Sequence, residues 1–160
     1  MRMDTFQIID HDFLEQVSAG AKNSPRRRKN YNFHASESDS CHRLLNAIEP
    51  DSYIQPHCHH EAAKDETLIV VRGRLGVVFF DERGTVTATV VLTPAGESVG
   101  VNIPHGMYHT LVALEPGSVF FEAKAGPYAP LTLREKASWA PAEGEPRAAS
   151  YLAELTRLFA

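Results

Sequence analysis

The chain has few cysteines, little net charge and no long apolar run. Two cysteines in 160 residues are too few for a disulfide framework, so we expect reduced thiols. A formal charge of −4 without a long basic stripe gives no sign of nucleic-acid binding. No run approaches the roughly 18 apolar residues of a membrane span, and residues 1–6 lack the apolar stretch of a signal peptide. We therefore expect a cytoplasmic protein with neither nucleic acid nor membrane as partner.

Length and composition indicate one globular domain. A chain of 160 residues can bury about 68–70% of its unfolded surface in a single core. Its 43% apolar and 22% charged residues are ordinary for such a protein. Within this domain we expect an N-terminal helix and basic arm at 1–40, a barrel at 41–126, and a C-terminal arm and helix at 127–160.

Helical periodicity is confined to the two ends of the chain. Residues 10–22 predict a helix, because Asp10 can cap its first turn and Leu14 and Val17 belong to one apolar stripe. Residues 150–160 predict a short final helix with one apolar side.

Between the helices, short runs of β type alternate with turn residues. The predicted strands lie at 42–49, 52–58, 66–72, 74–80, 85–92, 98–103, 109–115 and 118–124. Short strands at regular spacing indicate an antiparallel sandwich or barrel, and so a mainly β fold class. Runs such as 67–71 and 75–80 are apolar on both faces, so the outer face needs a helix, another sheet or a second subunit as cover. We expect a homodimer.

Four residues carry metal-ligand chemistry. Strand alternation places His57 and His59 on one face, while Glu66 and His109 begin later strands. The turn that ends at Gly106 can deliver His109 to the same place. Three imidazoles and one carboxylate suit a divalent transition metal, with Fe, Mn, Ni, Co and Zn all compatible. The plain alternative is a histidine-rich polar loop without a metal.

These residues resemble the two sequence motifs of the cupin superfamily. The first motif is similar to His57-x-His59, six residues, Glu66, six residues and Gly73, and the second to Pro104-x-Gly106-x-x-His109. The resemblance implies a single cupin jelly-roll β-barrel whose metal ligands are His57, His59, Glu66 and His109.

Within the cupins, the chain is similar to the WbuC family of cupin-fold metalloproteins. The matching stretches are 24–34, 71–75, 109–117 and 139–144, within a resemblance that covers most of 5–146. That family is associated with bacterial surface-polysaccharide gene clusters, which implies a sugar or nucleotide-sugar as the small-molecule ligand.

Five further residues are candidates for the site. His34 and Tyr31 are candidate catalytic acids or bases, although a structural role is the commoner one for such residues. Asn46 on an apolar strand and Arg28 in a basic run are candidate substrate-binding residues, the latter for a phosphate. The plainer alternatives are a satisfied core polar group or an outward position for Asn46 and a solvated charge run for Arg28. Tyr108 precedes a ligand and is a candidate for the pocket mouth, with plain packing as the alternative.

Three functions remain open from the sequence. The leading hypothesis is a metal-dependent isomerase, epimerase or oxygenase, the last including a cupin dioxygenase. A non-catalytic, metal-dependent sugar-binding or regulatory module is the second hypothesis, since one fold hosts many functions. A purely structural metal is the third.

Overall fold

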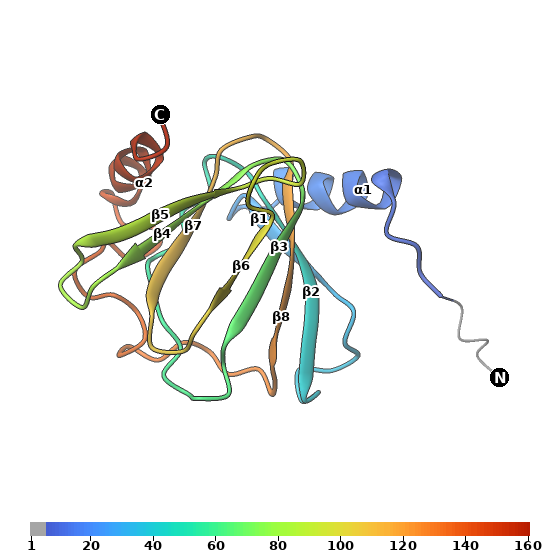
Figure 1. Ribbon diagram of the computed structural model, residues 1–160, viewed down its shortest axis with the longest axis horizontal. Helices are drawn as coiled ribbons and strands as arrows, with labels where there is room; N and C mark the ends of the chain where they lie inside the picture. Colours follow the sequence, from blue (N-terminus) through green and yellow to red (C-terminus); the bar gives the residue numbers. More distant parts are fainter. Residues whose placement is uncertain (1–5) are drawn as a thin grey trace.

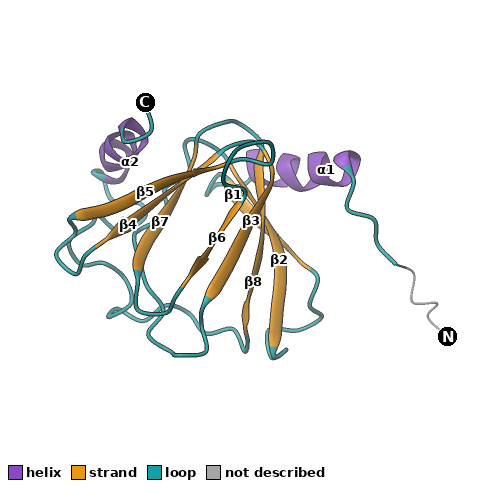
Figure 2. Ribbon diagram, viewed as in Figure 1, coloured by secondary structure: helices purple, strands orange, loops and turns teal. Residues whose placement is uncertain are grey.

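The computed structural model describes residues 6–160 and contains two antiparallel sheets with a helix beside each (Figure 1, Figure 2). In chain order the elements are α1 (His11–Lys22), β1 (Arg28–Asn32), β2 (Cys41–Ile48), β3 (Glu66–Arg72), β4 (Leu75–Phe80), β5 (Val86–Leu92), β6 (Gly100–Ile103), β7 (Tyr108–Ala113), β8 (Ser118–Ala125) and α2 (Ala148–Arg157). The larger sheet has the order β1-β2-β8-β3-β6 and the smaller one the order β5-β4-β7. Within the described residues these sheets form a sandwich and do not join into a closed barrel.

The predicted helices and strands are confirmed, apart from the strand at 52–58. In that segment only His57 forms isolated bridges, with His109 and Lys136. Two further backbone groups bond to the C-terminal arm: the Cys58 N–H donates to the Glu135 carbonyl, and the Pro56 carbonyl accepts from the Ala137 N–H. The sequence analysis also missed β1, a mostly exposed edge strand, because it has no apolar alternation.

The main core lies between the two sheets. Its fully buried members come from the inward-facing positions of strands in both sheets. They are Ile48, Leu68, Val70, Leu75, Val77, Leu92, Ile103, Leu111, Ala113 and Phe120. Burial of this set is the main favourable term for folding.

Each helix covers the outer face of one sheet. Helix α1 packs Leu14 and Val17 against Leu45 and Val119 of the larger sheet. Helix α2 packs over the smaller sheet, where a side chain at Gly76 would lie 2.6 Å from the Phe159 ring. Because the helices supply the cover that the apolar strands need, the predicted homodimer is not required for this purpose and stays a prediction.

The described residues contain no helix whose length and apolar content would suit a membrane crossing. The helices are short, and each buries only one side against a sheet.

Candidate metal centre

Backbone hydrogen bonds hold the histidine segments together. The His57 N–H donates to the His109 carbonyl at 3.0 Å, and the His109 N–H donates to the His57 carbonyl at 2.9 Å. Gly106, with a φ of 78°, forms the turn before β7, and its N–H donates to the His59 carbonyl at 2.6 Å. A left-handed φ favours glycine because it has no Cβ. The segments that carry the three histidines are thus fixed to one another without any metal.

The four predicted ligands lie together at one end of the sandwich. Ligand-type atoms of His57, Glu66 and His109 all lie within 4.8 Å of one another. The His59 Nε2 lies 2.9 Å from Glu66 Oε1, and the His109 Nε2 lies 3.2 Å from Glu66 Oε2. Ligand atoms bound to one ion at about 2.0–2.2 Å are separated by roughly 3–4 Å, so this group has the dimensions of a metal site.

The imidazole contacts give an independent test of that fit. His57 Nδ1 lies 3.0 Å from the Gln55 carbonyl oxygen, and His109 Nδ1 lies 2.9 Å from the Met107 carbonyl oxygen. If each Nδ1 donates to its carbonyl, the neutral ring presents an Nε2 lone pair. The His109 lone pair would then face a carboxylate oxygen of Glu66, which is favourable only with a proton or a metal ion between them. A divalent metal therefore fits this donor set.

The protonation of the group suits ligation. Burial and the neighbouring His109 lower the pKa of His57 to about 3, so this imidazole is neutral at physiological pH. Burial would raise the pKa of Glu66, but contacts with His109, His59 and Lys124 bring it well below its usual value. A neutral imidazole beside an ionised carboxylate is the form that binds metals.

Glu122 and Lys124 extend the centre along β8, and the sequence analysis did not select either of them. The Lys124 Nζ lies 3.0 Å from Glu66 Oε1 and 2.6 Å from Glu122 Oε1. The Asn46 amide donates to Glu122 Oε2 at 2.7 Å. Burial raises the pKa of Glu122, and Lys124 opposes that rise. Alternation along β8 carried the signal, because Glu122 and Lys124 follow the core residue Phe120 on the same face.

Asn46 and Arg28 are the predicted substrate-binding residues that the structure brings near the metal group. Both line a cavity of about 130 Å³ that also contains His57, Glu66 and His109. The Arg28 guanidinium donates to the Tyr53 carbonyl at 3.0 Å and pairs with Glu143 of the C-terminal arm. Arg28 therefore reaches the cavity with its charge already paired.

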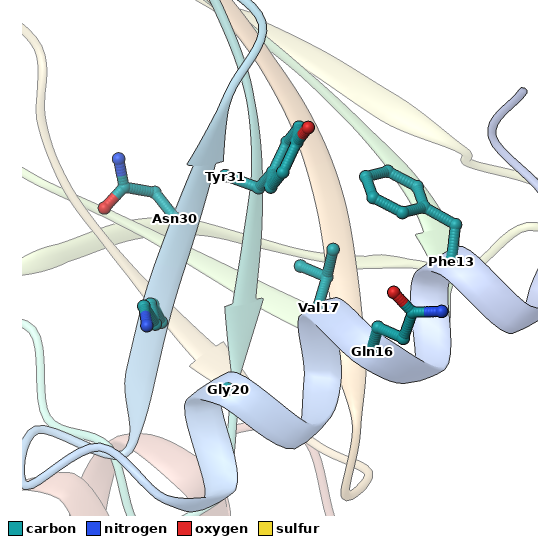
Figure 3. A pocket seen from close by; sticks show the side chains of 7 residues that line it. Phe13, Gln16, Val17, Gly20, Asn30 and Tyr31 are labelled. Carbon is teal, nitrogen blue, oxygen red and sulfur yellow. The ribbon is translucent and has the colours of Figure 1, made fainter. Parts of the chain in front are cut away.

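The structure does not bring Tyr31 or Tyr108 to the metal group. Figure 3 shows the Tyr31 side chain pointing toward α1, whereas Asn30 points away from that helix. Tyr31 packs edge-on against Phe13, at 4.9 Å between ring centroids, on the outer face of β1. The Tyr108 hydroxyl donates to the Arg134 carbonyl at 3.1 Å, and its ring packs beside Trp139, with 6.0 Å between centroids.

His34 occupies an intermediate position. It is buried, its Nδ1 lies 3.2 Å from the Arg43 backbone, and its ring stacks on His42 at 4.0 Å between centroids. Both rings line a cavity that also contains Glu122 and Lys124. His34 thus belongs to the wall of a neighbouring cavity and does not contact the four predicted ligands.

The loop between His59 and Glu66 is anchored at its end. The Lys64 Nζ donates to the carbonyls of Ala125 and Pro127 after β8. Asp65 accepts a hydrogen bond from the His105 N–H at 2.9 Å and so joins this loop to the turn before His109. These contacts fix the entry to β3 and therefore the position of Glu66.

A family model matches slightly more than half of the chain. It is described as a domain of unknown function (DUF6016) and matches residues 9–92. The matched segment includes His57, His59 and Glu66 and ends before His109. No curated protein matches the chain.

Solved structures share the fold at low identity. KdgF from Halomonas sp. is 20% identical with a TM-score of 0.51, over 67% of this chain and 85% of that one. The conserved SPY1581 protein of unknown function from Streptococcus pyogenes is 11% identical with a TM-score of 0.51, over 79% and 93%. A cupin superfamily protein, DSY2733 from Desulfitobacterium hafniense, is 11% identical with a TM-score of 0.45, over 61% and 77%. At these identities the likeness concerns the fold alone, and that fold is the cupin fold.

Proposed function

The chain belongs to the DUF6016 family of domains of unknown function, and we propose that it is a metal-dependent cupin enzyme that acts on a sugar or nucleotide-sugar. The observation that carries this proposal is the donor set of His57, Glu66 and His109, which lines a cavity and has His59 in contact with Glu66. The WbuC resemblance supports a role in surface-polysaccharide biosynthesis, which remains part of the proposal.

The four predicted ligands would hold the metal in the proposed enzyme. Three imidazoles and one carboxylate leave coordination positions free on a five- or six-coordinate ion. A bound metal would supply Lewis-acid chemistry, the polarisation of a carbonyl or hydroxyl group, which can promote isomerisation or epimerisation.

The protein groups beside the four ligands suit a hydroxylated substrate. Lys124 can donate to substrate oxygens, the Glu122 carboxyl can accept from hydroxyls, and the Asn46 amide can do both. Apolar side chains, including Ile54 and Leu111, form the rest of the wall and limit access of water. These residues would bind and orient the ligand, which is the main contribution a protein makes at such a site.

Metal content is the first measurement. Untagged protein, purified without chelators or added metal, should contain near-stoichiometric transition metal by elemental analysis. The His109→Ala variant should lose it. The matched variant His105→Ala should keep it, because His105 is not one of the four predicted ligands and alanine retains the backbone N–H that bonds to Asp65. Retention of full metal by His109→Ala, with unchanged affinity, would contradict the proposed centre.

Activity separates the enzyme from a binding module. Metal-loaded protein should convert a member of a panel of sugars and nucleotide-sugars, detected as new anomeric proton signals by NMR, and His109→Ala should not. Metal-dependent binding of a panel member without conversion would instead favour the non-catalytic module. Loss of folding on chelation would favour a structural metal.

A further inference from the structure

Three cavities meet at Lys124. The inner cavity, defined above, contains the metal group and has a volume of about 130 Å³. A second one, of about 200 Å³, is lined by His57, His59 and Tyr128. A third, which we name the outer cavity, has about 320 Å³ and lies along β1, β2 and β8. Lys124 lines all three, so the outer cavity adjoins the cavity of the metal group at this side chain.

The inner cavity by itself is small for a substrate. Pockets that hold drug-sized ligands typically have volumes of about 300–1,000 Å³. The inner cavity falls below that range, and the outer cavity reaches it. Asn46 and Glu122 line both, so a ligand that passes them would fill the two cavities together.

Three asparagines and a tyrosine give the outer cavity a set of uncharged hydrogen-bonding groups. Register places Asn30 opposite Asn46, and Asn32 follows Asn30 on the same face of β1. The Asn30 side-chain amide donates to the side-chain oxygen Oδ1 of Asn32 at 2.6 Å, which fixes the two side chains relative to each other. The half-exposed Tyr128 phenol stands at the rim. Amides and phenols both donate and accept, as sugar hydroxyls do.

The charges of the outer cavity disfavour an anionic ligand there. Among the described residues that line it, Lys124 carries the only permanent positive charge, and Glu66 and Glu122 already neutralise it. Glu37 adds a carboxylate to the same wall. The basic run is also engaged, since both Arg26 and Arg28 pair with Glu143. A pyrophosphate would find no unpaired guanidinium among these groups.

We propose that the outer cavity is a second subsite that binds an uncharged sugar unit of a ligand whose other end lies at the metal group. Asn30, Asn32 and Asn46 select the uncharged unit by hydrogen bonds to its hydroxyls. The inference rests on the proposed function, because it takes the metal group as the first subsite. It narrows the substrate class from sugars and nucleotide-sugars to glycosides that carry a metal-binding end and a neutral sugar.

Paired probes separate the two subsites. Gluconate offers a hydroxy acid to the metal, and lactobionate, maltobionate and cellobionate add one neutral hexose to the same acid. On protein loaded with one equivalent of Co²⁺, calorimetry should show at least one of the three binding about tenfold tighter than gluconate, the gain expected from one or two added hydrogen bonds. Equal affinity for gluconate and all three would overturn the second subsite.

Variants test whether Asn30 and Asn32 cause the tighter binding of the disaccharide acids. The double variant Asn30→Ala, Asn32→Ala should reduce the tighter probe to the affinity of gluconate while leaving gluconate and Co²⁺ binding unchanged. Lys29→Ala is the matched control, because Lys29 lies on the opposite face of the same strand. A gain that survives in the double variant would overturn the assignment of these residues.

Two further outcomes distinguish failure of the proposed function from failure of the second subsite alone. Gluconate and all three disaccharide acids failing to bind Co²⁺-loaded protein would overturn the proposed function, and the second subsite with it. Tighter binding of UDP-glucuronate than of glucuronate, lost in the double variant, would overturn the neutral-sugar assignment alone. Co²⁺ stoichiometry, read from the visible absorption band, is measured separately for every variant.

Discussion

The space between the two sheets has an apolar end and a polar end, and the change occurs within single strands. On each of four strands, an inward-facing apolar residue and an inward-facing polar residue lie two positions apart. The pairs are Ile48 and Asn46 on β2, Leu68 and Glu66 on β3, Leu111 and His109 on β7, and Phe120 and Glu122 on β8. The antiparallel pairing of β3 with β8 and of β2 with β8 brings the polar members to one end.

The two ends differ in what they contribute. Burial of apolar side chains stabilises the fold, whereas a buried carboxylate or ammonium costs free energy unless it is paired. The polar end holds Glu66 and Glu122 in contact with Lys124, beside the histidines, so its charged groups depend on their partners and add no apolar burial. The comparison therefore assigns folding to the apolar end and ligand chemistry to the polar end.

Truncation at the apolar end should have the largest effect on stability. Leu75 is fully buried in the core, and Leu75→Ala should lower the free energy of unfolding by about 3 kcal/mol, measured by urea denaturation. Ile69→Ala is the matched control, because Ile69 is 42% exposed and should cost much less. Folded Leu75→Ala protein should bind metal normally. A large loss of metal affinity would contradict the assignment of stability to the apolar end and metal binding to the polar end.

Removal of a ligand should have the largest effect at the polar end. We expect His57→Ala to weaken metal binding by at least about 100-fold, beyond the 10–100-fold range seen when only a ligand's supporting contact is lost. The unfolding free energy of the metal-free protein should change little. The control is His60→Ala, since His60 is exposed and next to His59. Equal affinities of the two variants, by competition with a chromophoric chelator, would contradict the assignment.

Loss of Lys124 should affect both the stability of the protein and its response to metal. Lys124→Met leaves Glu66 and Glu122 facing each other and should destabilise the metal-free protein by about 2 kcal/mol, less than for a fully buried pair because Lys124 is partly exposed. Added metal should restore more stability to this variant than to the parent protein. Lys29→Met provides the control, and an equal shift in melting temperature on metal addition would refute the compensation.

The smallest expected effect concerns acid stability. Burial opposes ionisation of Glu135, but hydrogen bonds from the Thr132 and His60 backbone N–H groups lower the pKa of its carboxyl to about 2. A depressed carboxyl pKa contributes stability that is present above about pH 4.3 and is lost as the pH falls toward 2. Glu135→Gln should remove that contribution, less than about 1 kcal/mol after screening by solvent.

Urea denaturation at pH 6 and pH 2 measures this contribution. The gap in stability between the parent protein and Glu135→Gln should narrow at the lower pH, whereas Glu61→Gln reports the loss of one exposed charge beside His60, whose N–H bonds to Glu135. An unchanged gap would contradict the role assigned to Glu135.

The sequence predicted most of the fold because its apolar periodicity is strong. Strands such as β4 and β7 are apolar enough to be identified locally, and Asp10 marks the start of α1 through a side-chain hydrogen bond to the Phe13 N–H. It did not predict β1, whose exposed polar residues carry no such pattern. The extended segment at 52–58 was taken as a strand because its own residues do not show that its partners lie in the C-terminal arm.

The four predicted ligands could be selected from sequence because their residue types and strand positions are local properties. Glu122 and Lys124 could be placed on an inward face in the same way, but their importance depends on contacts with Glu66 from a distant strand. Tyr31 and Asn30 are neighbours in the chain, and only the packing of α1 decided that Asn30 faces the cavities while Tyr31 faces the helix. Residue types and their positions along a strand can be read from the sequence. Contacts between residues of distant strands form only when the strands pair and the sheets pack.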